Sequence, residues 1–119
     1  MKVAISCKEH SADAEVDPRF GRAPCFAIYD TASDAFEFID NTQSLNSPSG
    51  AGVQAAQTIL NAEVSALLTG HCGPKAFRAL SSADVAIYTN VAGTVQEAVS
   101  AFKNKSISPA EEADVEGHW

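Results

Sequence analysis

The chain has 119 residues, of which 45% are hydrophobic and 19% are charged. This length and composition predict one domain around a single core, and they exclude global disorder. The formal net charge of -7 at pH 7 argues against nonspecific binding to nucleic acid or to anionic membranes as the main activity.

Neither the N-terminus nor the cysteine pattern predicts export. An apolar strand follows Met1 at once, without the long apolar stretch of a secretion signal. No window approaches the roughly 20 apolar residues that a transmembrane helix needs. The three cysteines include no close-spaced pair, unlike the framework of a secreted disulfide-rich domain. We therefore expect a cytoplasmic protein that has no membrane or nucleic-acid partner.

The first half of the chain predicts three strands and two irregular segments. Apolar runs separated by turn residues predict strands at residues 3–6, 25–30 and 35–39. Residues 8–24 contain prolines, a glycine and arginines, which indicate a structured loop rather than a helix. Residues 41–52 are rich in Asn, Ser, Pro and Gly, and we expect them to form the most mobile internal loop.

The second half alternates strands with helices. Short apolar runs predict strands at residues 65–68 and 85–88, and apolar spacing predicts helices at residues 51–61, 74–81 and 94–103. Thr94 and Glu97 match a capping box at the start of the last helix. Residues 1–103 then form a single domain, and residues 104–119, which lack periodicity, form a flexible tail.

This order of elements predicts an α/β fold with three layers. Three antiparallel strands followed by two right-handed crossovers give a five-stranded mixed sheet with helices on both faces. The first strand would lie beside the fourth, and the second would run antiparallel to its neighbours. With that topology Cys7, Cys25 and Cys72 converge at one edge of the sheet.

A histidine and a cysteine follow the fourth predicted strand, in the segment TGHCGPKAF at residues 69–77. Pro74 is suited to the first position of the next helix. Ligands of open α/β sheets bind at the carboxyl ends of strands, and a helix N-terminus there favours anions and lowers the pKa of a thiol. The pattern therefore predicts metal–sulfur chemistry at His71 and Cys72. Cations expected near the same end are Lys8, Arg19, Arg22, Lys75 and Arg78, an arrangement that suits a small anion or arises by chance.

Four segments resemble a known family. They are VDPRFGRAP at residues 16–24, GAGVQAA at 50–56, GHCGPKAF at 70–77 and GTVQEA at 93–98. Together they resemble the dinitrogenase iron–molybdenum cofactor biosynthesis family, which includes NifX-like carriers, the C-terminal domain of NifB and the orange protein of sulfate reducers. The resemblance implies a ribonuclease-H-like α/β/α fold and noncatalytic carriage of a metal–sulfur cluster. The cargo would be a molybdenum–copper sulfide, held largely without covalent protein ligands, or an iron–sulfur precursor, and cluster-donor or acceptor proteins would be partners.

These considerations give a set of candidate site residues. The expected contacts to the cluster are Arg19, Arg22, Gly50, Gly52, His71, Cys72, Gly73, Lys75, Asn90 and Gly93, and the expected metal ligands are Cys72, His71 and Cys7.

Each candidate also has a structural explanation. Cys7, Cys25 and Cys72 suit core packing, and His71 could bond backbone carbonyls. The arginines could hold their loop against Asp17, and the glycines of residues 50–52 suit close packing of a helix on the sheet.

Three functions compete at this point. The first is a metal–sulfur cluster carrier or assembly scaffold, and the second is a regulatory or adaptor domain with a vestigial pocket. The third is a nuclease, because the fold also occurs in nucleases. That reading fails because two-metal nucleases need clustered carboxylates, whereas the first strand ends in Ser6 and Cys7.

Overall fold

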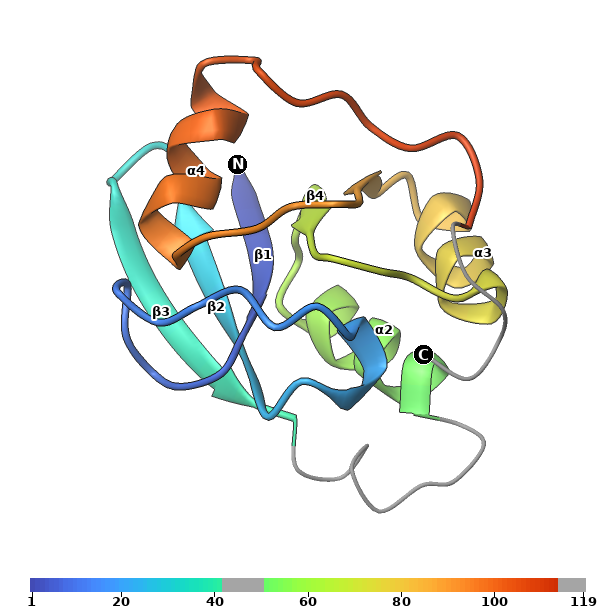
Figure 1. Ribbon diagram of the computed structural model, residues 1–119. Helices are drawn as coiled ribbons and strands as arrows, with labels where there is room; N and C mark the ends of the chain where they lie inside the picture. The colour runs from blue at the N-terminus through green and yellow to red at the C-terminus, as the bar shows by residue number, and fades with distance from the viewer. Residues whose placement is uncertain (42–50, 114–119) are drawn as a thin grey trace.

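The computed structural model in Figure 1 describes residues 1–41 and 51–113. Five strands form one sheet in the order β3-β2-β1-β4-β5. Strand β2 is antiparallel to β1 and β3, whereas β4 is parallel to β1 and β5. The strands are β1 (Lys2–Cys7), β2 (Cys25–Asp30), β3 (Ala35–Asp40), β4 (Ala66–Leu68) and β5 (Ala86–Tyr88). The predicted five-stranded mixed sheet, with the first strand beside the fourth, is confirmed.

Helices cover both faces of the sheet (Figure 1). Helices α2 (Ala51–Asn61) and α3 (Pro74–Ser82) pack on one face, and helix α4 (Val95–Lys103) packs on the other. Successive residues of a strand point to opposite faces, so the sheet separates two hydrophobic cores. The predicted three-layer arrangement is therefore confirmed.

Helix α4 begins at the predicted capping box. The Thr94 side chain accepts a hydrogen bond from the Glu97 amide at 3.2 Å, and the Glu97 carboxylate accepts one from the Thr94 amide at 2.8 Å. These bonds satisfy two backbone donors at the helix start. They also fix where the chain leaves the loop after β5, which belongs to the candidate site described below.

The predicted flexible tail is attached to the domain along residues 104–113. These residues form no helix or strand, but the Ala110 amide donates a hydrogen bond to the Ile87 carbonyl at 2.7 Å. Ile107 packs against the core beneath α4. Figure 1 shows this segment crossing from the end of α4 to α3. The rest of the predicted tail lies outside the described residues.

No helix among the residues that the structure describes is long and apolar enough to cross a membrane.

Candidate functional site

Three loops meet at the carboxyl ends of the parallel strands. They follow β1 (residues 8–24), β4 (residues 69–73) and β5 (residues 89–94), and we call the surface that they share the rim. Their contacts are mainly backbone hydrogen bonds. The His71 amide donates to the Pro18 carbonyl at 2.7 Å, the Asn90 amide donates to the Gly70 carbonyl at 2.7 Å, and the Val16 amide donates to the Gly93 carbonyl at 2.9 Å. Consequently the three loops form one continuous surface.

Gly70 allows the closest approach between two of these loops. A Cβ atom at this position would lie 2.6 Å from the Cα atom and 2.7 Å from the carbonyl oxygen of Pro18. No side chain fits at that distance from backbone atoms. The glycine is therefore required for the β4 loop to lie directly against the β1 loop.

A cavity of about 540 Å³ opens beside this junction. It lies between the first part of the β1 loop and the start of α4, and its wall includes Pro18, Val91, Gly93 and Thr94. Gly93 has a φ of 91°, which L side chains rarely adopt. Charged side chains of Lys8, Glu15 and Glu97 also line the cavity.

Buried polar groups support the rim from below. The Ser6 hydroxyl donates to the Asp17 carbonyl at 2.8 Å and lies 2.8 Å from the Thr69 hydroxyl. The Asp17 carboxylate accepts a hydrogen bond from the Arg19 amide at 2.9 Å, and it lies 3.7 Å from the Arg19 guanidinium. Arg19 therefore contacts Asp17 within the loop, as expected if this arginine stabilises the loop rather than binding a ligand.

His71 and Cys72 occupy different environments although they are neighbours. His71 is half-exposed on the rim, whereas the Cys72 side chain is fully buried in the core beneath α2 and α3, together with Phe20 and Ala76. Gly73 precedes α3 as its N-cap, and Pro74 occupies the first turn, as expected. The Cys72 side chain is thus part of the core, and its Sγ atom lies 3.7 Å from the Gly73 carbonyl oxygen.

The three cysteines lie at one end of the sheet, as predicted, but their side chains lie on two different faces. Cys7 and Cys25 are paired across β1 and β2 at the same end of the sheet as Cys72. However, the Cys7 and Cys25 side chains lie in the core beneath α4, on the opposite face. Alternation along β1 places Cys7 on this face, because residues 3, 5 and 7 of β1 all face α4.

The expected metal ligands do not form a coordination group. Within residues 1–41 and 51–113, no three His, Cys, Asp or Glu side chains are placed to hold a metal ion together. Cys7 therefore does not join His71 and Cys72 in one site. A contact between Cys72 or His71 and a cluster stays a prediction.

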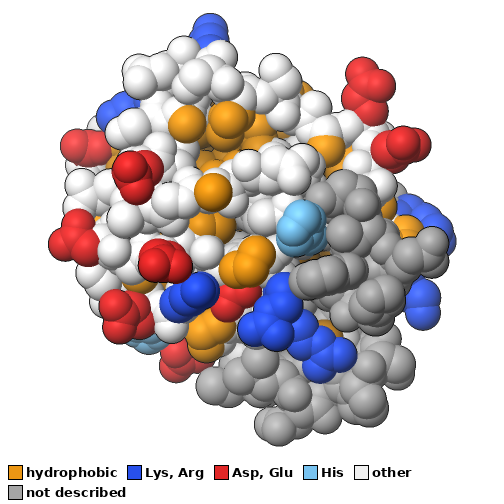
Figure 2. Space-filling view, viewed as in Figure 1, with side chains coloured by type: hydrophobic (Ala, Val, Ile, Leu, Met, Phe, Trp, Pro, Cys, Tyr) orange, Lys and Arg blue, Asp and Glu red, His pale blue; other side chains and the backbone are white. Residues whose placement is uncertain are grey.

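The expected basic groups are only partly neutralised. Lys8 lies 3.3 Å from Glu15, and Arg19 is held by Asp17. Among the described residues, no carboxylate pairs with Arg22 or Lys75. Figure 2 shows Lys and Arg side chains gathered over the short 3-10 helix η1 (Phe20–Arg22), whereas acidic side chains are more frequent on the left of this face. The rim thus has a local basic area on an acidic protein.

Of the two glycines predicted at the start of α2, the structure describes only Gly52. A Cβ atom on Gly52 would lie 3.3 Å from the Cβ atom of Ala76, so this glycine permits close packing of α2 against α3. The expected contact was between the helix and the sheet; the observed one is between two helices. Gly50 lies outside the described residues.

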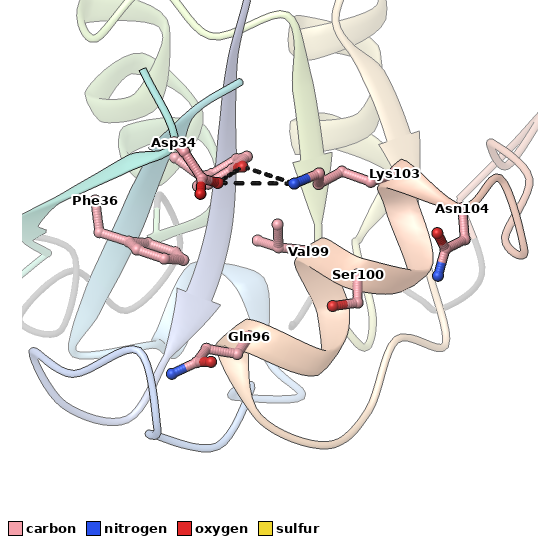
Figure 3. A pocket seen from close by; sticks show the side chains of 8 residues that line it. Asp34, Phe36, Gln96, Val99, Ser100, Lys103 and Asn104 are labelled. Atoms are coloured by element: carbon pink, nitrogen blue, oxygen red, sulfur yellow. Dashed lines mark hydrogen bonds and ion pairs between the residues drawn. The ribbon is translucent and has the colours of Figure 1, made fainter. Parts of the chain in front are cut away.

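A second cavity, of about 310 Å³, lies between β3 and α4, away from the rim (Figure 3). The Tyr29 hydroxyl donates to the Asp34 carboxylate and accepts a hydrogen bond from Lys103 at 3.2 Å. The hydrogen bond from Tyr29, followed by the charge of Lys103, holds the pKa of Asp34 below its usual value. Sequence patterns do not indicate this cluster, because Lys103 is 74 residues away from Tyr29 in the chain.

A family model described as dinitrogenase iron–molybdenum cofactor matches residues 1–105. The apo form of the orange protein from Desulfovibrio gigas is 36% identical, with 96% of each chain covered and a TM-score of 0.94. A Thermotoga protein (TM1290), provisionally described as a NifB protein, is 33% identical, with 98% of each chain covered and a TM-score of 0.84. The uncharacterized protein MJ0580 of Methanocaldococcus jannaschii is 27% identical over 105 residues, which are 86% of this chain and 85% of that protein.

The family match and the two structural relatives extend over nearly all the elements described above, including the three loops of the rim. The motifs at residues 16–24, 70–77 and 93–98 lie in these loops or at the helix starts that follow them. The chain therefore belongs to the dinitrogenase iron–molybdenum cofactor family.

Proposed function

We propose that this protein binds and carries an anionic metal–sulfur cluster at the rim, without catalysing a reaction on it. The cluster is the cargo: a molybdenum–copper sulfide, or an iron–sulfur or iron–molybdenum precursor. The observation that carries the proposal is the likeness to the apo form of the orange protein, which covers 96% of each chain. Cluster-donor or acceptor proteins are the corresponding partners.

The chemistry of the rim supports a cargo held by charge and hydrogen bonds. Arg22 is half-buried at the end of η1, and Lys75 is exposed in the first turn of α3, directly after the β4 loop. An arginine presents several N–H donors in a fixed fork, and a lysine acts as a mobile point charge. Backbone amides and cationic side chains can hold an anionic sulfide cluster without metal–protein bonds.

The position of the rim also supports the proposal. Ligands of open α/β sheets bind outside the carboxyl ends of the strands, where loops from neighbouring strands meet. Here β1, β4 and β5 end at the same edge, and their loops are joined by hydrogen bonds. A preformed surface reduces the ordering entropy that binding has to overcome.

Anaerobic reconstitution tests the proposal. The apo protein is incubated with tetrathiomolybdate and Cu(I), or with ferrous iron and sulfide, and is then desalted. Visible absorption and the metal-to-protein ratio report retention. We expect a coloured protein with one of these cargoes and reduced retention in Arg22→Ala and Lys75→Ala, more clearly at low salt because exposed charges are screened within about 8 Å at 0.15 M.

Lys105→Ala is the matched control, because it removes one exposed positive charge beyond the end of α4. It should retain the cargo like the wild type. Cys72→Ser separates two modes of binding: unchanged loading excludes direct thiolate ligation, whereas loss of loading supports it. A colourless wild-type protein with every cargo would contradict the proposal and favour the regulatory or adaptor function.

A further inference from the structure

We propose that Cys7 and Cys25 form a reversible disulfide bond that closes the β1 loop at its base. This inference goes beyond the proposed function and does not depend on the cargo. It concerns two thiols that the candidate site does not use.

The first observation is the pairing of the two residues. Cys7 is the last residue of β1 and lies directly opposite Cys25, the first residue of β2. Side chains at directly opposed positions of antiparallel strands point to the same face. Their Cα atoms are about 4.5–5.5 Å apart in such pairs, which is within the range of disulfides.

The second observation is the contact between the sulfur atoms. The two Sγ atoms lie 3.5 Å apart, and each thiol also lies near the backbone carbonyl of the other residue, at 3.7 Å and 3.4 Å. Since a disulfide bond is about 2.05 Å long, each sulfur needs to move by only about 0.7 Å. Two thiols packed for volume alone need not point at each other. Cys72 is on the other face of the sheet and has no access to this pair.

The third observation is the segment that the bond would enclose. Residues 8–24 lie between the two cysteines, and they carry Pro18, Arg19 and Arg22 to the rim. The dithiol therefore lies where this loop leaves and re-enters the sheet. A disulfide there would restrain the loop in the unfolded chain and limit its opening in the folded protein.

The reaction needs an oxidant, and the class that we name is a small-molecule disulfide such as oxidised glutathione. One cysteine thiolate attacks it, forming a mixed disulfide and releasing one small thiol. The second cysteine thiolate attacks the protein-side sulfur, so that the Sγ–Sγ bond forms and the second small thiol leaves. The cysteine pair loses two electrons and two protons, and the small disulfide takes up both to become two thiols.

Burial affects the rate of this reaction. Both side chains are nearly inaccessible, and burial raises the pKa of the Cys7 thiol to about 12. The pKa of Cys25 is also raised, chiefly by burial. Because the thiolate is the reactive form, closure in the folded state is slow. The experiment therefore lets the pair form while the chain refolds.

The protein is unfolded and refolded in a buffer of reduced and oxidised glutathione, the remaining thiols are alkylated, and the pairings are mapped by peptide mass spectrometry. The same redox buffer with denaturant gives the pairing of the unfolded chain. Three cysteines allow three pairings. We expect the ratio of oxidised to reduced Cys7–Cys25 pair to be at least about tenfold higher after refolding than in denaturant, because native register brings these thiols together. A dithiol reductant should reverse it.

Thermal unfolding supplies a second readout. Closing a loop of this length should raise the unfolding midpoint on the order of 10 °C in wild type and in Cys72→Ala. Cys25→Ala should show no such rise. Pairing in the refolded protein equal to that in denaturant, or an oxidised protein with an unchanged midpoint, would overturn the proposal. Neither readout needs a cluster, so a failure of the proposed function leaves this test intact.

Discussion

Replacing Gly70 by alanine tests whether the rim depends on a close approach of two backbones. The added Cβ would lie 2.6 Å from the Pro18 Cα atom, whereas carbon atoms in contact prefer about 3.5–4.0 Å. The overlap is therefore about 1 Å. Since the obstructing atoms belong to the backbone, a change of side-chain rotamer cannot relieve it.

The magnitude follows from what has to move. Overpacking of this kind costs about 1–3 kcal/mol. Separating the loops also weakens the hydrogen bond from the His71 amide to the Pro18 carbonyl, now 2.7 Å long, and a hydrogen bond contributes about 0.5–1.5 kcal/mol. The reduced entropy of the unfolded chain offsets about 0.4–1 kcal/mol of this. We expect Gly70→Ala to lower the free energy of unfolding by about 1–3 kcal/mol.

Urea denaturation measures the effect, as a midpoint lowered by roughly 1 M because m-values are about 1–3 kcal/mol/M. The control is Gly52→Ala, whose Cβ would lie 3.3 Å from the Ala76 side chain rather than against backbone. Alanine in place of glycine within a helix stabilises by about 0.5–1 kcal/mol. This gain offsets the cost of the close contact with Ala76, so the stability of the control should be nearly unchanged. If Gly70→Ala were as stable as the wild type, the loop junction would be adaptable and the reasoning wrong.

Two further predictions follow from shifted pKa values. The pKa of Cys7 is about 12 in the folded protein, against 9.0 for an ordinary thiol. The unfolded chain therefore loses this proton at lower pH than the folded protein does. The free energy of unfolding should then fall as pH rises above 9.0, by at most about 1.4 kcal/mol per pH unit. Urea midpoints up to about pH 10.5 should show a steeper loss for the wild type than for Cys7→Ala, and parallel profiles would contradict this. Tyr29→Phe removes the main cause of the lowered pKa of Asp34, which should move back toward its usual value. An unchanged value in an NMR titration would show that Lys103 alone holds it.

The order and direction of the strands could be predicted because they follow from local signals. Apolar runs, turn residues and the Thr94–Glu97 capping box each mark a boundary, and the right-handed crossover rule then leaves few topologies. The same topology places the ends of the first, fourth and fifth strands at one edge of the sheet. These parts of the prediction are confirmed by the sheet order and by the backbone bonds between the loops.

The environment of each cysteine could not be predicted from the sequence. Both faces of β1 are buried, so its residues do not alternate between apolar and polar, and the faces of Cys7 and Ser6 cannot be told apart. Cys72 lies in a loop, where strand alternation no longer applies. The support of the rim by Ser6, Asp17 and Thr69 also depends on contacts between distant segments.

The Cys72 side chain is buried in the protein without cargo. The free-energy cost of exposing it can be compared with the free energy that a metal–thiolate bond would supply. To reach the rim, the Sγ atom would leave the core that it shares with Phe20 and Ala76. Vacating so small a volume costs on the order of 1 kcal/mol, as in substitutions that remove one buried methyl group. Binding of a structural zinc ion supplies about 10–16 kcal/mol over four ligands, so one thiolate bond outweighs this cost. By this comparison packing alone does not prevent ligation by Cys72. A cargo held by the rim alone would load Cys72→Ser fully and leave Arg22 and Lys75 as the sensitive positions.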